Sequence, residues 1–249
     1  MKKERRNVKE VITRMATLAT LSALGFVLMA FAQFPYPMAP WLKIEISEIV
    51  TILAYALYGF PGGIIVAIVK TALNLAYHGL SGLGIGDLTA LFTSGMFILA
   101  LFLTSHVFKW FKKGLGFRIL AYTFLAVFVS TILTIANAIV ITPSYLTVFG
   151  SSPRFATCFE EGMIQNVTAY LTKDSTSTHN AWTYVGTIST IYLPFNLIKT
   201  VACCVLYELL FNRLIFVFMR KSEFFSKYFV GNIFTKETSE EEVTLSDDN

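Results

Sequence analysis

The chain has 249 residues, of which 55% are hydrophobic, 15% aromatic and only 14% charged, with a formal net charge of +4. This composition lies far from that of soluble domains, so it excludes an ordinary soluble domain and predicts an integral membrane protein. Six of the sixteen acidic residues lie between positions 237 and 248. The rest of the chain is therefore more basic than the total charge indicates.

Six segments are apolar enough to cross a membrane as helices, which predicts an all-α fold with six transmembrane helices. The run before the first segment, "MKKERRNVKE", also allows a cleavable signal peptide, but the following apolar stretch is long for one. The second and third segments are short and are joined by "YGFPGG", where Pro61, Gly62 and Gly63 predict a turn. Short segments interrupted by Gly and Pro are typical of a binding region. The six predicted spans are 15–32, 46–60, 62–78, 88–108, 117–142 and 188–219.

The basic residues predict the orientation, because Lys and Arg accumulate in cytoplasmic segments. With six spans and a cytoplasmic N-terminus, fifteen of the twenty Lys and Arg residues fall on the cytoplasmic side. Both termini are therefore expected in the cytoplasm of a multi-pass plasma-membrane protein. The predicted organisation is a basic segment 1–14, a membrane domain 15–220 with outer loops 33–46 and 143–187, and an acidic tail 221–249.

The first outer loop contains "WLKIEISE", in which apolar and polar residues alternate. Such alternation indicates a segment with one face on protein and the other toward solvent or a ligand, so we expect a lid. Trp41 offers an aromatic face for a flat ring, while Lys43 and Glu45 reach polar groups of the ligand or latch the loop. The alternative is that Trp41 is an interfacial anchor and both charges are solvated.

Ionisable and amide side chains within apolar spans are costly and usually face a cavity or a partner. Asn196 and Lys199 are three residues apart after Pro194, and share one helix face. A carboxamide beside an ammonium offers donors and an acceptor for a polar ring edge, so both are candidate ligand contacts. Lys70 and Asn74 share a helix face in the same way. Asn74 is a candidate ligand contact, whereas for Lys70 a purely structural role is the alternative.

Two further polar residues have equally balanced interpretations. Asn137 is a lone amide in an apolar helix, where it contacts either a ligand or a neighbouring helix. Tyr145 follows Pro143 at the expected outer end of its span, where interfacial tyrosines are common. We include both among the candidate binding residues.

Small residues form a nearly flat face on the first predicted helix. Ala19 and Ala23 are four residues apart, with Ala16 and Ser22 nearby. Small residues at this spacing let another helix approach closely, so Ala16, Ala19 and Ala23 are a candidate contact for a partner subunit.

The sequence contains no signature of catalysis or metal binding. It carries neither an HExxH helix nor a GxSxG elbow, and Cys158, Cys203 and Cys204 fit no metal-ligand spacing. The run "GLSGLGIGD" is not a phosphate-binding loop, and we interpret it as an outer turn capped by Asp87. We therefore expect no enzyme, cofactor, metal or nucleic-acid partner, with the lipid bilayer as the surroundings. A standalone ion-coupled carrier is a rival hypothesis, for which the acidic candidate is Glu208, near the inner end of the last predicted span.

The segment "FPYPMAPWLKIEISEIVTILAYALYGFPGGIIVAIVKTALN", followed downstream by "NAIVITPSY" and "LPFNLIKT", resembles the riboflavin-specific substrate-binding (S) components of energy-coupling factor (ECF) vitamin transporters. The resemblance spans about residues 15 to 215. It implies a six-helix protein that binds riboflavin near the outer surface beneath the first loop. It also implies that the first helix contacts a transmembrane coupling subunit driven by two ATPases.

The resemblance assigns flavin contacts to Asn137, Asn196 and Lys199, and lid positions to the first-loop residues. The sequence departs from the family pattern at Glu45 and Glu48, where Asp is usual, and in its longer second outer loop. FMN or another flat vitamin therefore remains an alternative ligand.

Overall fold

The computed structural model describes residues 2–79, 81–110, 115–149 and 154–209. The acidic segment 221–249 and the end of the sixth predicted span lie outside the described residues. Five helical stretches are long and apolar enough to cross a membrane: Val11–Phe31, Glu48–His78, Ile85–Val107, Gly116–Phe149 and Ala181–Leu209. The chain is therefore a mainly helical, multi-pass membrane protein, as its composition predicted.

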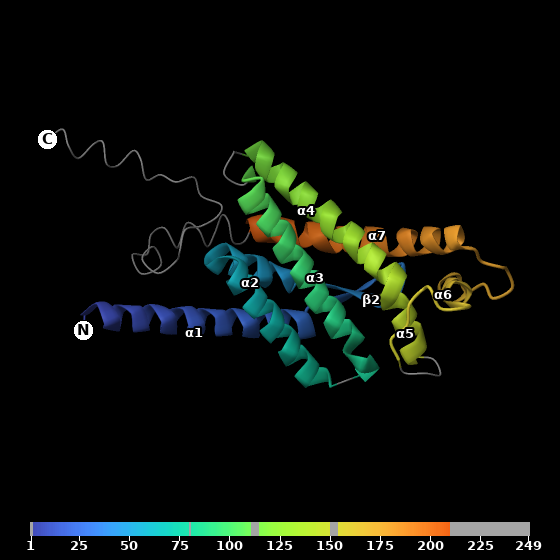
Figure 1. Ribbon diagram of the computed structural model, residues 1–249, viewed down its shortest axis with the longest axis horizontal. Helices are drawn as coiled ribbons and strands as arrows, with labels where there is room; N and C mark the ends of the chain where they lie inside the picture. Colours follow the sequence, from blue (N-terminus) through green and yellow to red (C-terminus); the bar gives the residue numbers. More distant parts are fainter. Residues whose placement is uncertain (1, 80, 111–114, 150–153, 210–249) are drawn as a thin grey trace.

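The elements follow one another in the order seen in Figure 1. The first half of the chain forms α1 (Lys2–Phe31), β1 (Gln33–Tyr36), β2 (Ala39–Glu45), α2 (Glu48–His78), the 3-10 turn η1 (Ser81–Gly84), α3 (Ile85–Phe102) and the π-helical turn η2 (Leu103–Val107). The second half forms α4 (Leu115–Ala136), the π-helical turn η4 (Asn137–Ile141), α5 (Thr142–Phe149), α6 (Met163–Thr172) and α7 (Ala181–Leu206).

The second and third predicted spans both lie in α2, which is broken at Gly59. Gly59 has φ +70° and ψ −160°, a conformation open essentially to glycine alone. The turn predicted at Pro61, Gly62 and Gly63 was therefore misplaced. Pro61 is tolerated inside a helix here because it lies in the first turn after the break, where backbone N–H groups have no intrahelical partner. The two halves of α2 point in different directions (Figure 1).

The core is formed where α1, α2, α3, α4 and α7 pack together. α1 packs on α2, α2 on α3, and α4 crosses α7. Fully buried side chains from three of these helices, Tyr55, Phe97 and Leu125, belong to one apolar cluster. Many large apolar side chains on the outside are exposed, as lipid-facing helices require.

The first predicted loop is an antiparallel hairpin of β1 and β2, so the fold contains a short sheet that the all-α prediction left out. Gln33 pairs with Glu45 and Pro35 with Lys43, with an irregularity at Tyr36. The predicted alternation of residues thus reflects a strand, whose side chains point to opposite faces in turn.

The fifth predicted span is longer than expected. η4 and α5 continue the helix beyond α4, so the chain stays helical past Pro143 to Phe149. Proline has no N–H, so it cannot bond the carbonyl groups one turn before it. Those carbonyls find other partners: Cys158 donates its N–H to Ile139 O at 2.9 Å, and the Tyr184 hydroxyl donates to Ala138 O. These two bonds tie the segment after α5 and the start of α7 to η4.

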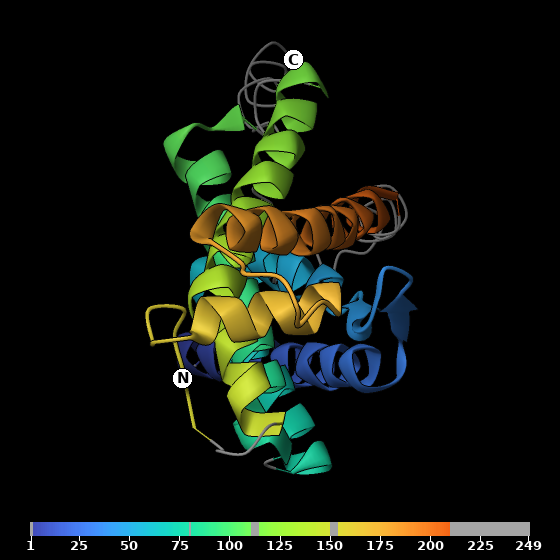
Figure 2. The same cartoon turned by 90° about the vertical axis from the view of Figure 1, so that its right-hand side faces the viewer.

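The second predicted outer loop is thus largely helical. α6 lies across one end of the molecule, beside α5 and the beginning of α7 (Figure 2). The hairpin lies toward this same end, opposite the beginning of α1 (Figure 1).

Candidate functional site

A cavity of about 470 Å³ lies between the hairpin, α2, α3, the end of α4 and α7. This volume is within the range of small-molecule sites, roughly 300 to 1,000 Å³. Its lining includes seven of the eight side chains that the sequence proposed for ligand binding: Lys43, Glu45, Asn74, Asn137, Tyr145, Asn196 and Lys199. We call it the site cavity.

The hairpin forms one wall of the site cavity. Lys43 and Glu45, two residues apart on β2, line the cavity, whereas Ile44 between them packs against the buried cluster of Tyr36 and Phe195. The rings of Tyr36 and Phe195 have centroids 5.4 Å apart. The hairpin is thus seated on α7 by apolar contacts, and it presents its charged residues to the cavity.

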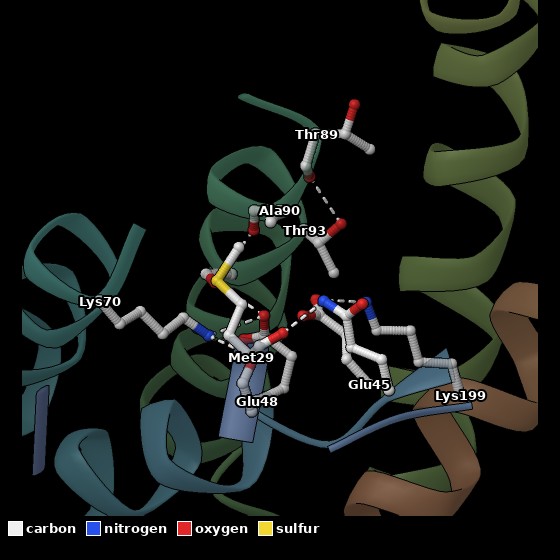
Figure 3. Close-up of polar contacts among 11 residues, drawn as sticks. Met29, Glu45, Glu48, Lys70, Thr89, Ala90, Thr93 and Lys199 are labelled. Atoms are coloured by element: carbon white, nitrogen blue, oxygen red, sulfur yellow. Dashed lines mark hydrogen bonds and ion pairs between the residues drawn. The ribbon is translucent and has the colours of Figure 1, made fainter. Parts of the chain in front are cut away.

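An ion pair in the wall of the cavity joins the hairpin to α7. Lys199 Nζ lies 2.9 Å from Glu45 Oε1, and both side chains are about nine-tenths buried. Figure 3 shows the two side chains meeting from β2 and α7. Burial raises the pKa of Glu45, yet the charges of Lys199 and Lys70 and the hydrogen bond from Lys199 together outweigh that effect, so the pKa of this carboxyl lies below its ordinary value.

A second ion pair lies at the beginning of α2. Lys70 Nζ is 2.9 Å from Glu48 Oε1 and 3.2 Å from Ser47 Oγ, and Ser94 Oγ donates to the same Glu48 oxygen at 2.8 Å. Both charged side chains are fully buried, and Figure 3 shows Lys70 reaching Glu48 on the far side from Lys199. A Cβ at Gly25 would lie 3.2 Å from Lys70 Cδ, so α1 also packs closely on this side chain.

Asn74 and Lys70 therefore have different roles although they share a helix face. Asn74 lines the site cavity and donates to Asp87 Oδ1 at 2.7 Å. The predicted capping role of Asp87 was wrong: Gly84 occupies the N-cap position of α3, and Asp87 lines the cavity instead. Asn74 Oδ1 is buried without a hydrogen-bond partner within the described part of the chain, which makes it an acceptor available to a ligand.

The other amides and Tyr145 border the cavity from η4, α5 and α7. Asn137 Nδ2 donates to Leu133 O at 2.8 Å, and Asn196 Nδ2 lies 3.5 Å from Thr134 Oγ1, the limit of a hydrogen bond. The Tyr145 ring stacks on Phe149 with centroids 5.7 Å apart and planes within 7°. Both amides are buried, so a ligand would meet them without competing water.

The sequence analysis missed several residues that line the cavity. Thr89 and Thr93 of α3 lie on the same face of the helix, and Thr93 Oγ1 donates to Thr89 O at 2.8 Å. Their i, i+4 spacing after Asp87 was a signal that could have found them. His78, Tyr192 and Phe195 also line the cavity, but nothing in their local sequence separates them from residues of an ordinary helix.

Two predictions remain, the role of Trp41 and the small-residue face of α1. The side chain of Trp41 lies outside the described residues, so its proposed role stays a prediction. Ala16, Ala19 and Ala23 are all exposed on α1, whereas Ser22 is buried at 1% exposure. The three alanines are thus accessible to another helix, away from the site cavity.

The described residues bring together no group of three or more His, Cys, Asp or Glu side chains suited to a metal ion. Cys203 and Cys204 are buried and Cys158 is partly buried, all as free thiols.

Comparison with known proteins identifies the family. The family model described as "ECF transporter, substrate-specific component" matches residues 13–211. The chain belongs to this family. We refer to it below as an S component.

Two curated relatives of this S component are transporters. It is 28% identical over 207 residues to the riboflavin transporter FmnP of Bacillus subtilis (strain 168), covering 82% of this chain and 92% of the relative. It is 28% identical over 202 residues to the riboflavin transporter RibU of Staphylococcus aureus (strain TCH60), covering 81% and 89%.

A solved structure described as the S component of a bacterial ECF transporter has the same fold. The TM-score is 0.54 at 24% identity, covering 83% of this chain and 97% of that one.

Proposed function

We propose that this S component captures riboflavin at the outer face of the membrane and delivers it to a transmembrane coupling subunit driven by two ATPases. The observation that supports this most is the single cavity lined by seven side chains that were selected from the sequence. Its similarity to two riboflavin transporters over four-fifths of the chain favours riboflavin as the ligand.

The chemistry of the site cavity suits riboflavin. One edge of the flavin ring and the ribityl chain carry many hydrogen-bond donors and acceptors, which require buried polar partners. Asn196 and Asn137 provide amides, Lys199 and Glu45 provide a charged donor and acceptor, and Asn74 Oδ1 is an acceptor without a partner among the described residues. These groups project from separate elements into one space, as recognition of several ring atoms requires.

The hairpin is proposed to act as the lid of this site. Its ion pair with α7, between Glu45 and Lys199, is the charged contact that would hold it closed. Because a closed segment mainly retains bound ligand, opening of this pair should govern release more than capture.

The proposed orientation places the cavity at the outer face. The beginning of α1 and the hairpin lie toward opposite ends of the molecule (Figure 1), and the basic residues favour a cytoplasmic N-terminus. The exposed face of Ala16, Ala19 and Ala23 is then the proposed contact for the coupling subunit within the bilayer.

The rival hypothesis of a standalone ion-coupled carrier is less well supported. Glu208 pairs with Arg118 and accepts a hydrogen bond from Tyr122 at 2.6 Å. Glu48, at the beginning of the second predicted span, is a fully buried acid, and it pairs with Lys70. Both carboxylates are therefore compensated by a cation, which disfavours a role as a proton carrier.

Riboflavin binding by the purified protein tests the proposal directly. Lys199→Ala and Asn196→Ala should each weaken binding more than tenfold, because an unpaired buried polar group costs about 1 to 3 kcal/mol. Asn166→Ala, which removes an exposed amide from α6, is the matched control and should bind as tightly as the unaltered protein. Unchanged affinity in both site variants would place the ligand elsewhere, and tighter competition by FMN than by riboflavin would change the assigned ligand.

Uptake in cells tests the coupling face. Ala19→Leu with Ala23→Leu should abolish uptake yet leave riboflavin binding by the isolated protein unchanged, because bulky side chains prevent close helix approach. Ala72→Leu with Ala76→Leu is the control, since this exposed pair has the same spacing on α2. Equal loss of binding and uptake in the α1 variant would contradict the assignment of this face to the coupling subunit.

A further inference from the structure

A second compartment of about 550 Å³ adjoins the site cavity. The two share five lining residues, including Asn137, Tyr145 and Tyr192, so they form one continuous space. The rest of its wall is mainly apolar and is contributed by α5 and α6, through Leu146, Val167, Tyr170 and Leu171. We call it the apolar compartment.

α6 is held firmly enough to act as a wall. Its Met163 and Val167 are buried in a cluster with Tyr184, Ile188 and Tyr192 of α7, and the helix contacts both α5 and α7. It lies across the end of the molecule at which α7 begins (Figure 2). A buried apolar cluster of this kind fixes the position of a helix of only ten residues, which would be marginal alone.

The polar groups divide unevenly between the two spaces. Lys43, Glu45, Asp87 and Lys199 line only the site cavity, whereas the apolar compartment contains no charged side chain in its described lining. A ligand that occupies both spaces must therefore be polar at one end and apolar at the other.

We propose that the apolar compartment is a second subsite, in which α6 holds and selects the apolar end of the ligand. This inference rests on the proposed function. One edge of the flavin ring carries two methyl groups and the opposite edge carries carbonyl and imino groups, so the methyl edge lies between Leu146 and Leu171 while the polar edge faces Lys199 and Asn196. Leu146 and Leu171 are then specificity-determining residues for the substituents on that edge.

The unaltered protein should distinguish riboflavin from the analogue that lacks the two ring methyl groups. Two buried methyl groups favour riboflavin about tenfold. Both affinities are measured by quenching of flavin fluorescence on titration with the purified protein. Equal affinity for the two flavins would overturn the proposal.

Two variants test which residues form the subsite. Leu171→Trp fills the compartment and should weaken riboflavin binding at least tenfold, whereas Asn166→Trp, on the exposed face of the same helix, should leave it unchanged. Leu146→Ala enlarges the compartment from the α5 side and should reduce the methyl preference to below threefold.

The outcomes separate this inference from the proposed function. Riboflavin binding that is undiminished in Leu171→Trp, or a methyl preference that stays tenfold in Leu146→Ala, would overturn the subsite. If Leu171→Trp does not fold, the Leu146→Ala measurement decides the question alone. Failure of the unaltered protein to bind either flavin would instead refute riboflavin as the ligand, and with it the basis of this inference.

Discussion

The buried pair of Glu48 and Lys70 should contribute to stability and not to ligand selection. The two groups are 2.9 Å apart and both side chains are fully buried. If Lys70→Met removes the cation, Glu48 keeps the hydroxyl of Ser94, but its Oε2 atom already has no hydrogen-bond partner among the described residues. An uncompensated buried charge costs about 3 to 5 kcal/mol.

For a domain of this size, that loss lowers the melting temperature by roughly 6 to 20 °C. Replacing both partners, as Lys70→Met with Glu48→Met, should restore most of the loss, because an apolar pair of similar volume is often neutral. Lys43→Met is the control: it removes the same charge from an exposed position and should change the melting temperature by less than about 2 °C.

A thiol-reactive dye can follow this unfolding in detergent without ligand. Cys203 and Cys204 are buried and react only when the helices separate, while Cys158→Ser removes the partly buried thiol from the background. The reasoning is refuted if Lys70→Met melts within 2 °C of the unaltered protein, or if the double variant is less stable than Lys70→Met alone.

Three further predictions concern the helix break, the hairpin and its ion pair. Gly59→Ala should destabilise the protein by about 1 to 3 kcal/mol, because its φ of +70° strains any residue with a Cβ, whereas Gly95→Ala, also in open space, should be neutral or stabilising; equal melting temperatures would contradict this. Riboflavin should quench part of the tryptophan fluorescence, Trp41→Phe should remove most of that change and speed ligand release, and the 84% exposed Trp182 should report little; quenching that persists in the variant would leave Trp41 as an interfacial anchor. The unaltered protein should melt at a higher temperature than Glu45→Gln. This difference should be constant above pH 4.5, the ordinary pKa of a glutamate, and should decline as the pH falls through the lowered pKa of Glu45 in the folded protein. A difference that grows on acidification would contradict this prediction.

Local sequence patterns predicted the features that depend on neighbours along one helix. The apolar runs identified the membrane-crossing helices because their length and hydropathy are set by the bilayer. The spacing of Asn196 and Lys199 placed both on one face, and both line the cavity. The spacing of Ala19 and Ala23 likewise predicted one face, which is exposed.

Tertiary structure alone decided which of these faces meet. Glu45 and Lys199 are 154 residues apart, and their pairing depends on how the hairpin sits on α7. Lys70 and Asn74 share a face, yet Lys70 is directed to Glu48 because α2 turns back on itself at Gly59. The glycines and the proline of "YGFPGG" predicted that the helix breaks within this segment. Which of these residues adopts the non-helical conformation depends on how the two halves of α2 pack against the other helices.

The apolar compartment is the clearest example of a feature that the sequence did not predict. The segment after Pro143 carries polar residues and a proline that predict a loop, whereas α5 and α6 form there and wall off a space beside the site. α6 buries Val167 and Met163 against α7, a contact with residues far along the chain. The periodicity of a helix fixes which side chains share a face, but the partner of that face is fixed only by packing, because burial depends on the whole set of helices that exclude lipid and water together.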